Sequence, residues 1–297
     1  MDVKADSAQL PLKSVIFATD FSSCSENAGR YASMLARQFD AELLVSHAFV
    51  LSQSAMEAES EAGPAGKSLQ RKDLEVALAG AAQRFGDGVK RSATALLEGD
   101  PRERIPQFAE QNAPSIIVLG TSGRGRIVRG LVGSVAERIL RSTSGPSLTV
   151  GPLVPALTPG ASTFRNILYA TGLYPGAAQG ASYAVGVAKA FQASMEVLHV
   201  VKAEDVKRPE QFSEIQKRFR AILDVIVPEQ AKDLCNPVGL VEVGNAHERI
   251  LEYVREFSAD LLVLSIRKSS HLWLQARLSG AFNIIANAPC PVLTITG

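Results

Sequence analysis

The sequence predicts an α/β protein built from two tandem, doubly wound, Rossmann-like domains, each with a parallel five-stranded sheet. Three observations lead to this prediction. Short apolar runs alternate with longer segments of helical periodicity. The runs are apolar at nearly every position, as strands of a parallel sheet buried on both faces must be. The whole alternation then occurs a second time along the chain, which indicates a duplicated unit.

The first half contains five predicted strands and four predicted helices. The strands are Val15–Ala18, Leu43–Ala48, Ala93–Leu97, Ile116–Leu119 and Leu148–Val150. The helices are Cys24–Phe39, Lys67–Phe85, Arg102–Gln111 and Ser134–Arg141. In a doubly wound sheet, ligands bind beyond the carboxyl ends of the strands, at the point where the strand order reverses. Asp20 and Gly120 both follow strand ends and are therefore expected at one rim.

The second half repeats this pattern. Val15–Thr19 aligns with Ile167–Thr171 at a shift of 152 residues, and Pro146–Thr149 aligns with Pro291–Thr294 at a shift of 145. The predicted strands of this half are Ile167–Ala170, Glu196–Val201, Gly239–Val243, Leu261–Leu264 and Val292–Ile295. Proline and glycine between the copies are typical of a semi-rigid connector. The predicted domains are residues 1–152 and 164–297, joined by a linker at 153–163.

Composition excludes several classes of function. Lys and Arg number 31 against 30 Asp and Glu, so the charge balance indicates neither a nucleic-acid partner nor an acidic tail. The three cysteines are widely spaced without a C-x-x-C pair, which favours a reducing cytosol. The beginning of the chain lacks the pattern of a signal peptide, and no apolar run has the length of a membrane span. We therefore expect a soluble cytoplasmic protein without a membrane partner.

The segment Gly120–Ser134 is the strongest functional signal in the chain. Its glycines, Gly120, Gly123 and Gly133, can adopt positive φ and expose backbone N–H groups, while a helix beginning at Ser134 directs its positive dipole end to the same place. The segment lacks the Lys-Ser/Thr pair of a P-loop, and no G-x-G-x-x-G is present. A local anion site of another kind is expected.

Some of these residues also have purely structural interpretations. Ser134 with Glu137 forms the pattern of a capping box, and Asp20 is a candidate N-cap of the first helix. His47 and His199 end equivalent strands in both copies and are interpreted as structural. His247 and His271 have no partner at metal-ligand spacing, so no metal site is predicted. No general base or nucleophile–histidine pair is apparent beside the glycine segment, so no catalytic residue is predicted.

The spacing G-x2-G-x9-G-S from Gly120 to Ser134, together with Asp20 after the first strand, resembles the ATP-binding universal stress protein family, whose fold is adenine-nucleotide α-hydrolase-like. The resemblance implies ATP, with or without Mg²⁺, as the ligand. In that family the aspartate lies against the adenosine, the residue after the second-strand histidine contacts the base through its backbone, and the glycine segment surrounds ribose and phosphates. The nucleotide-binding residues implied here are Ala18, Thr19, Asp20, Ala48, Gly120, Gly123, Arg124, Gly133, Ser134 and Val135.

The second half has lost this motif. Gly172 stands where Asp20 would be, and Ser265 replaces Gly120. Each lost charge-assisted hydrogen bond costs roughly 1.5–3 kcal/mol, so two or three losses would weaken a micromolar site to the millimolar range or beyond. One nucleotide site per chain, in the first half, is expected.

Three functions stay open from the sequence. The leading one is an ATP-binding stress-response protein whose nucleotide state alters its conformation or partners, with little or no catalysis. The alternatives are a nucleotide-free interaction scaffold and a slow ATP hydrolase. An intramolecular pseudo-dimer is expected to form through Leu148–Val150 and Val292–Ile295, and the resemblance also implies a homodimer.

Overall fold

The computed structural model describes residues 10–50, 65–121, 131–158, 164–172, 177–227, 237–266 and 274–296. The chain packs into two compact units. The N-terminal unit contains the described residues of 12–126 and 133–145, and the C-terminal unit contains those of 1–11, 127–132 and 146–297. The chain therefore passes from one unit to the other more than once. The linker predicted at 153–163 separates the two sequence repeats, and it stays a prediction.

The N-terminal unit is built on a parallel sheet of β1 (Ser14–Ala18), β2 (Glu42–Phe49), β3 (Ser92–Glu98) and β4 (Ser115–Gly120). Their order is β3-β2-β1-β4. The chain proceeds from β1 outward to β2 and β3, and it then returns to the other side of β1 to form β4. The strand order consequently reverses between β1 and β4, which is where a doubly wound sheet offers a ligand site.

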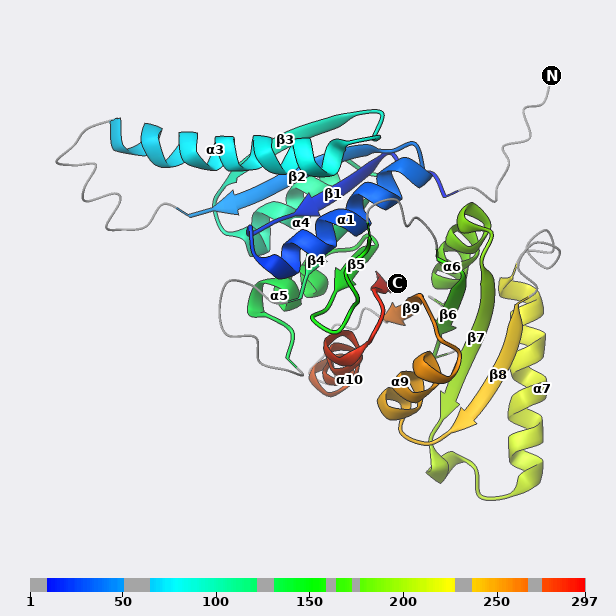
Figure 1. Ribbon diagram of the computed structural model, residues 1–297. Helices are drawn as coiled ribbons and strands as arrows, with labels where there is room; N and C mark the ends of the chain where they lie inside the picture. The colour runs from blue at the N-terminus through cyan, green and yellow to red at the C-terminus, as the bar shows by residue number, and fades with distance from the viewer. Residues whose placement is uncertain are drawn as a thin grey trace. The chain divides into compact units, whose positions relative to one another are not determined.

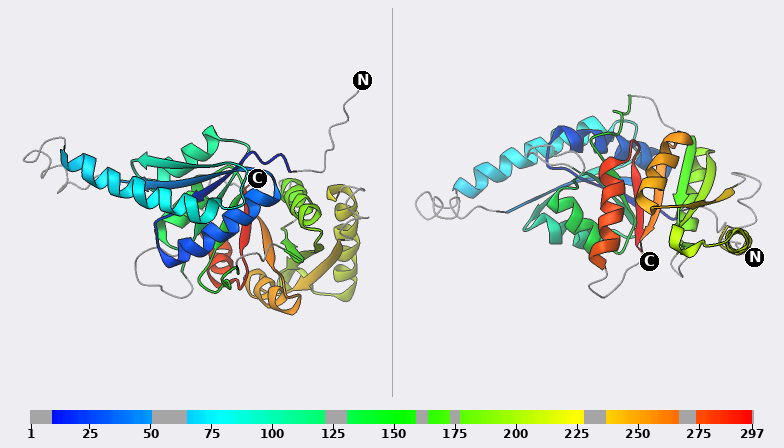
Figure 2. Two further views of the ribbon diagram at one scale, coloured as in Figure 1. Left: turned by 45° about the horizontal axis from the view of Figure 1, so that its top comes forward. Right: turned by 90° about the horizontal axis from the view of Figure 1, so that it is seen from below.

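Helices cover both faces of this sheet, as Figures 1 and 2 show. The helices are α1 (Ser23–Gln38), α3 (Ala65–Gly86), α4 (Pro101–Gln111) and α5 (Ser134–Ser142). Helix α1 contacts α3 over one face, and α4 contacts α5 over the other. Phe17 of β1 is completely buried, and its ring meets that of Phe85 of α3 edge to face at 5.2 Å. Burying such a side chain contributes about 1.5–3 kcal/mol, which fastens helix to sheet.

The C-terminal unit repeats the arrangement with two additional strands. Its strands are β5 (Ser147–Val150), β6 (Asn166–Ala170), β7 (Ser194–Val201), β8 (Val238–Val243), β9 (Leu261–Ile266) and β10 (Val292–Thr296), in the order β5-β10-β9-β6-β7-β8. The strands from β10 to β8 are parallel, and β5 runs antiparallel to β10. The last strand of the first repeat thus pairs with the last strand of the second.

The helices of the C-terminal unit are α6 (Ala177–Phe191), α7 (Pro209–Ile226), α9 (Ala246–Glu256) and α10 (Leu274–Asn287), with a short 3₁₀ turn at Ala203–Asp205. Helix α6 contacts α7, and α9 contacts α10, so that each pair covers one face of the sheet. No helix in the described ranges is long and apolar enough to cross a membrane.

The predicted fold class is confirmed, because both repeats form doubly wound α/β sheets. Every predicted strand is present within one or two residues of its predicted limits. The expectation of five parallel strands in each domain needs one correction, which concerns β5. Thr149 lies opposite Val292, and Leu148 lies opposite Leu293, in antiparallel register. An exposed strand edge is a template for pairing, and β10 provides such an edge for β5.

Candidate functional site

The rim of the N-terminal sheet brings together the ends of β1, β2 and β4. Ala18, the last residue of β1, pairs with Ser46 on one side and Leu119 on the other. Thr19 continues the ladder by one bond, because its N–H donates to the carbonyl of Ser46 at 2.9 Å. Asp20 and Gly120 follow directly. The predicted convergence of these two segments, which are about a hundred positions apart in sequence, is therefore present in the fold.

Asp20 begins the turn that leads into α1. Its Oδ1 accepts a hydrogen bond from the N–H of Ser22 at 3.0 Å. The N-cap of α1 is Ser22, whose hydroxyl accepts from the N–H of Ser25 at 3.2 Å. The interpretation of Asp20 as the N-cap was therefore wrong by two residues. Its carboxylate instead fixes the turn at the rim and holds one negative charge at the start of a helix, where the dipole stabilises it.

Thr19 makes three further hydrogen bonds besides the one from its N–H to Ser46. Its hydroxyl lies 2.9 Å from that of Ser25, and it accepts from the N–H of Phe21 at 2.9 Å. Its carbonyl oxygen lies 2.7 Å from Nδ1 of His47, so this ring nitrogen carries the donated proton. Phe21 adopts a left-handed φ of 61°, and its ring lies 4.7 Å from the imidazole of His47. His47 therefore has the structural role that was expected for it.

Ala48 presents its backbone to the space beyond the end of β1. In a strand, the N–H and C=O of one residue point to the same neighbour, and the direction alternates along the chain. Ser46 accepts from Thr19 on the β1 side, and Phe49 accepts from Gly99 on the β3 side. The donor and acceptor of Ala48 consequently point toward β1, which has already ended at Ala18. A planar ligand edge at this place would find one donor and one acceptor.

Gly120 and Gly133 permit close contacts with neighbouring residues. The sequence analysis had expected these glycines for a different reason, namely a positive φ. A Cβ on Gly120 would lie 3.1 Å from the backbone and Sγ of Cys24 and from the N of Ser25, so a side chain would push α1 away from β4. A Cβ on Gly133 would lie 3.1 Å from the carbonyl oxygen of Thr121. Neither glycine has a positive φ, and that of Gly133 is −62°. The expectation of left-handed glycines was therefore wrong for these two positions.

The first turn of α5 has no side-chain cap among the described residues. Gly133 is the N-cap, and its N–H donates to the carbonyl of Thr121 at 2.7 Å. Ser134 is the first helical residue, so the predicted capping box is wrong, and Glu137 instead forms an ion pair with Arg141 at 2.6 Å. The first N–H groups of a helix lack partners within the helix. Those of Ser134 and Val135, two exposed residues, thus begin a positive helix end beside β4.

Thr121 is a site residue that the sequence analysis missed. It is 1% exposed, and its hydroxyl has no hydrogen-bond partner in the part of the chain that the structure describes. A buried hydroxyl without a partner costs about 1–3 kcal/mol, so this atom is suited to bind a water or a ligand atom. Gly123 and Arg124, two of the predicted contacts, lie outside the described residues.

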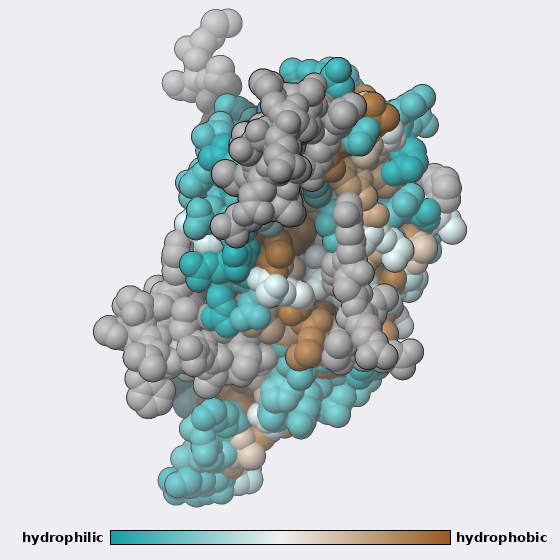
Figure 3. All heavy atoms as spheres, turned by 90° about the vertical axis from the view of Figure 1, so that its left-hand side faces the viewer, coloured by the Kyte–Doolittle hydropathy of each residue, from teal (hydrophilic) through white to brown (hydrophobic). Residues whose placement is uncertain are grey.

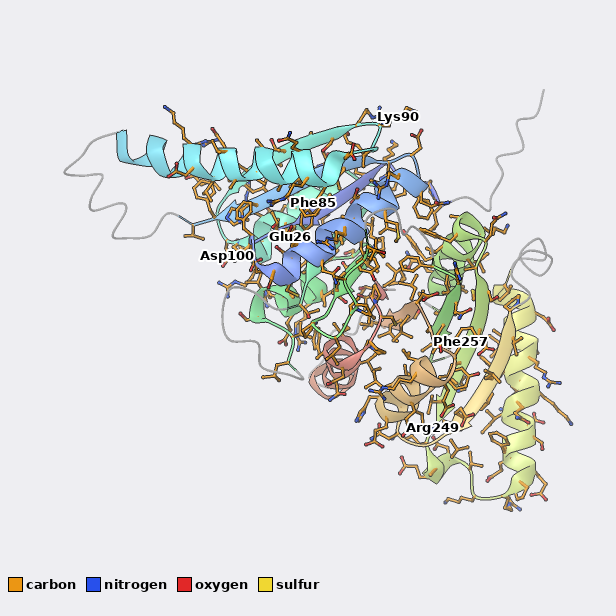
Figure 4. The ribbon with its side chains drawn as sticks, viewed as in Figure 1. Glu26, Phe85, Lys90, Asp100, Arg249 and Phe257 are labelled. Atoms are coloured by element: carbon orange, nitrogen blue, oxygen red, sulfur yellow. The ribbon has the colours of Figure 1, made fainter. Side chains whose placement is uncertain are left out.

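The same rim also carries charge and apolar surface. Figure 4 labels Glu26, in the first turn of α1, and Asp100, the N-cap of α4, in the same part of the N-terminal unit. Hydrogen bonds from Arg102 lower the pKa of Asp100 to about 2, so this N-cap of α4 stays ionised. Figure 3 views the molecule from this side and shows hydrophobic atoms between hydrophilic ones. Val50 after β2 and Val135 on α5 are exposed by 61% and 41%.

The C-terminal unit keeps the scaffold of the rim. The N–H of Thr171 donates to Leu198 at 3.0 Å, and Nδ1 of His199 lies 2.9 Å from the carbonyl of Thr171, as for Thr19 and His47. Burial of the imidazole lowers the pKa of His199. Since the arrangement occurs in both units, it is part of the scaffold that the duplication preserved.

The chemistry of the second rim is different. The hydroxyl of Ser265, at the position of Gly120, lies 3.0 Å from that of Tyr169, which donates to the carbonyl of Ala177 at 2.6 Å. A Cβ on Gly180 would lie only 1.9 Å from Ser265 Oγ. Hydroxyl groups of Ser265 and Tyr169 therefore stand where Gly120 has no side chain and α1 approaches closely in the first unit. Gly172 supplies no carboxylate where Asp20 does. Within the described residues, no group of three or more His, Cys, Asp or Glu could hold a metal ion.

Two doubly wound α/β units in tandem, with a glycine-bordered rim at the strand-order reversal of the first, define a duplicated Rossmann-like protein. A sequence model described as the universal stress protein family matches residues 11–151 and again 163–296. The chain therefore belongs to the universal stress protein family, with two family domains in tandem, and the predicted resemblance is confirmed.

Individual relatives agree with this assignment. A universal stress protein of Methanocaldococcus jannaschii is 30% identical over 138 residues, which cover 46% of this chain and 81% of the relative. A universal stress protein of Thermus aquaticus is 30% identical over 139 residues, which cover 46% of this chain and 98% of the relative. The crystal structure of a universal stress protein from Archaeoglobus fulgidus superposes with a TM-score of 0.74 at 19% identity, covering 97% of this chain and 99% of that one. This last similarity establishes the tandem fold.

Proposed function

We propose that the N-terminal unit binds an adenine nucleotide, ATP in the first instance, at the rim between β1 and β4. Asp20 would hold the nucleoside through its carboxylate, and the backbone of Ala48 would pair with the edge of the base. Gly120, Gly133 and the first turn of α5 at Ser134 and Val135 would surround the phosphates. Adenine follows from the family resemblance, and a polyphosphate follows from the anion-binding character of the helix end.

The observation that carries the proposal is made at the start of α5. This helix end lacks a side-chain cap among the described residues, and it lies beside the buried hydroxyl of Thr121. Gly133 at the N-cap has no side chain to satisfy the first N–H groups of the helix. Thr121, whose carbonyl anchors Gly133, carries a buried hydroxyl without a partner in the described ranges. An anion at this place would receive donors from both. Gly123 and Arg124, which follow Thr121 in sequence, would complete the phosphate contacts.

We further propose that the bound nucleotide acts through conformation or partners, with little or no hydrolysis. When bound, the nucleotide supplies concentrated negative charge that would hold the end of β4 and the start of α5 together. The C-terminal unit would stay without nucleotide, because Ser265 and Tyr169 fill the position of the glycine and Gly172 lacks the carboxylate. A nucleotide-free scaffold and a slow ATP hydrolase are the competing functions.

The paired strands β5 and β10 support the proposed intramolecular pseudo-dimer of the two repeats. The hydroxyl of Thr149 donates to the carbonyl of Val292 at 3.1 Å, and that of Thr294 donates to the carbonyl of Ser147 at 3.0 Å. These bonds are reciprocal, because Thr149 and Ser147 are equivalent to Thr294 and Val292 at the shift of 145 residues. An isologous contact has this self-complementary form. A homodimer of the whole chain would need another surface.

The test is the nucleotide content and affinity of the purified protein. We expect denatured protein to release adenine nucleotide that mass spectrometry identifies. Asp20→Ala removes a charge-assisted contact of about 1.5–3 kcal/mol, so it should weaken ATP binding by about 10- to 150-fold. Gly133→Val should abolish binding, because its side chain meets Thr121. The matched controls on α3 are Asp73→Ala, at an exposed position, and Gly80→Val, whose Cβ meets nothing within 4 Å, and both should bind as the wild type does.

The same measurements separate the alternatives. Absence of released nucleotide, with no thermal shift on adding ATP or ADP, would establish the scaffold and reject the proposal. Steady phosphate release from ATP far above that of the Asp20→Ala variant would establish a hydrolase. Equal affinities of Asp20→Ala and Asp73→Ala would show that the nucleotide binds elsewhere.

A further inference from the structure

Leu10 packs against a glycine in the middle of α6. An ideal Cβ built on Gly186 would lie 2.4 Å from Cγ of Leu10 and 3.0 and 3.1 Å from its two methyl groups. Real Cβ atoms do not approach other heavy atoms so closely, so any other residue at position 186 would displace Leu10. The leucine side chain therefore fills a notch in α6 that only glycine leaves open.

The duplicated sequence shows what this notch replaces. Position 186 is equivalent to Met34 of α1 at the shift of 152 residues, since Phe39 and Phe191 end the two helices at the same shift. Met34 is 1% exposed, so α1 fills this place with its own side chain. In α6 the glycine supplies no side chain, and a leucine nearly 180 positions earlier supplies the apolar volume instead. Filling an apolar void stabilises a core.

The residues after Leu10 enter the other unit. The N–H of Lys13 donates to the carbonyl of Pro114 at 2.9 Å, and its carbonyl accepts from Glu42 at 2.9 Å, so Lys13 already belongs to the sheet of the N-terminal unit. Leu10 is grouped with the C-terminal unit. Only Pro11 and Leu12 separate the two attachments.

We propose that Leu10 and Gly186 form a clasp that fastens the segment before β1 to the C-terminal unit. It links the order of the first residues of β1 to the packing of α6. This inference does not depend on nucleotide binding.

The decisive variant is Gly186→Met, which gives α6 the residue that α1 has at the equivalent position. Its side chain fills the notch from within the helix and expels Leu10 while the apolar volume is kept. Amide hydrogen exchange, followed by mass spectrometry, should become at least tenfold faster over residues 12–14. Exchange within α6 should not become faster, because methionine favours a helix more than glycine does. Gly80→Met is the matched control, because a side chain at Gly80 of α3 meets nothing within 4 Å, and it should leave residues 12–14 unchanged.

A second variant guards against a misfolded Gly186→Met protein. Leu10→Ala keeps the glycine and introduces no clash, and it should accelerate exchange over residues 12–14 in the same direction. Leu12→Ala, two positions later, removes an equal volume while leaving Leu10 in the notch and serves as its control. Unchanged exchange over residues 12–14 in Leu10→Ala, or an equal effect of Leu12→Ala, would overturn the clasp.

Discussion

The hydroxyl groups of Thr19 and Ser25 lie 2.9 Å apart, buried between the end of β1 and the first turn of α1. In the second unit, the equivalent threonine, Thr171, has a different hydrogen-bond partner. Ala177 stands in place of Ser25, and Tyr169 stands in place of Phe17 at the shift of 152 residues. Burial raises the pKa of Tyr169, and hydrogen bonds with Ser265 and Thr171 oppose that rise. The hydroxyl partner of the rim threonine thus comes from the helix in one unit and from the strand in the other.

Replacing Ser25 should destabilise the N-terminal unit. Ser25→Ala leaves the buried hydroxyl of Thr19 without the partner to which it donates, which costs about 1–3 kcal/mol of unfolding free energy. Chemical denaturation measures this loss. Ser23→Ala, at an exposed position two residues earlier, is the control and should change the stability little. Equal stability of the two variants would show that the Thr19–Ser25 bond contributes nothing net.

Gly180 is expected to tolerate no side chain, because a Cβ there would lie 1.9 Å from Ser265 Oγ and 2.9 Å from the hydroxyl of Tyr169. Gly180→Ala should destabilise the protein by about 1–3 kcal/mol through overpacking. Adding Ser265→Gly should recover part of the loss, and a double-mutant cycle measures that coupling. Gly80→Ala, in open space on α3, should be neutral or slightly stabilising. Strict additivity of the two substitutions would contradict the contact.

The stability of the protein should fall in mild acid because of His199. Burial lowers the pKa of His199 below its ordinary value of 6.5. The unfolded chain therefore binds more protons than the folded one as the pH falls through this value, and the free energy of unfolding decreases until the folded pKa is passed. Denaturation in urea at several pH values between about 7 and 5 measures the slope.

The control for this pH effect is His199→Asn, which keeps a donor for Thr171 but does not titrate. The variant should lose part of the pH dependence of the wild type, because the other histidines contribute equally to both proteins. Two identical slopes would assign the pH effect to other groups.

Cys290 should resist modification in the folded protein. It is 4% exposed, and burial raises the pKa of its thiol to about 12, so the reactive thiolate is scarce. Cys24 is only half-buried. Iodoacetamide near pH 8 should therefore alkylate Cys24 at least about tenfold faster than Cys290, and denaturation should abolish the difference. Mass spectrometry of the alkylated peptides measures both rates, and equally rapid labelling in the native protein would contradict the burial.

The sequence-based prediction was accurate for features that depend on local patterns. It was wrong for features that depend on contacts between residues far apart in the sequence. The strand predicted at Ile116–Leu119 is β4, extended by one residue at each end, because an apolar run buried on both faces is visible in the residues themselves. The start of α5 at Ser134 was also correct. Its cap was not, because the carbonyl of Thr121 holds Gly133 in the capping position. That contact joins the residue after β4 to the residue before α5.

The candidate site shows the same division. Topology alone placed Asp20 and Gly120 at one rim, and the fold agrees. The reason expected for a glycine at position 120, a positive φ, was wrong. A glycine is required there because Cys24 and Ser25 of α1 approach closely. Thr121 was missed because a buried hydroxyl that lacks a partner among the described residues has no signature in the sequence.

The sequence by itself determined the duplication, the alternation of strands and helices and the rim at which Asp20 and Gly120 meet. These features depend on periodicity and on topological rules that act along the chain. Only the tertiary structure decided which side chains became partners: Ser25 for Thr19, and Leu10 for the notch at Gly186. The physical reason is that close packing and hydrogen bonding act between neighbours in space, and a pattern read along the chain does not contain their distances.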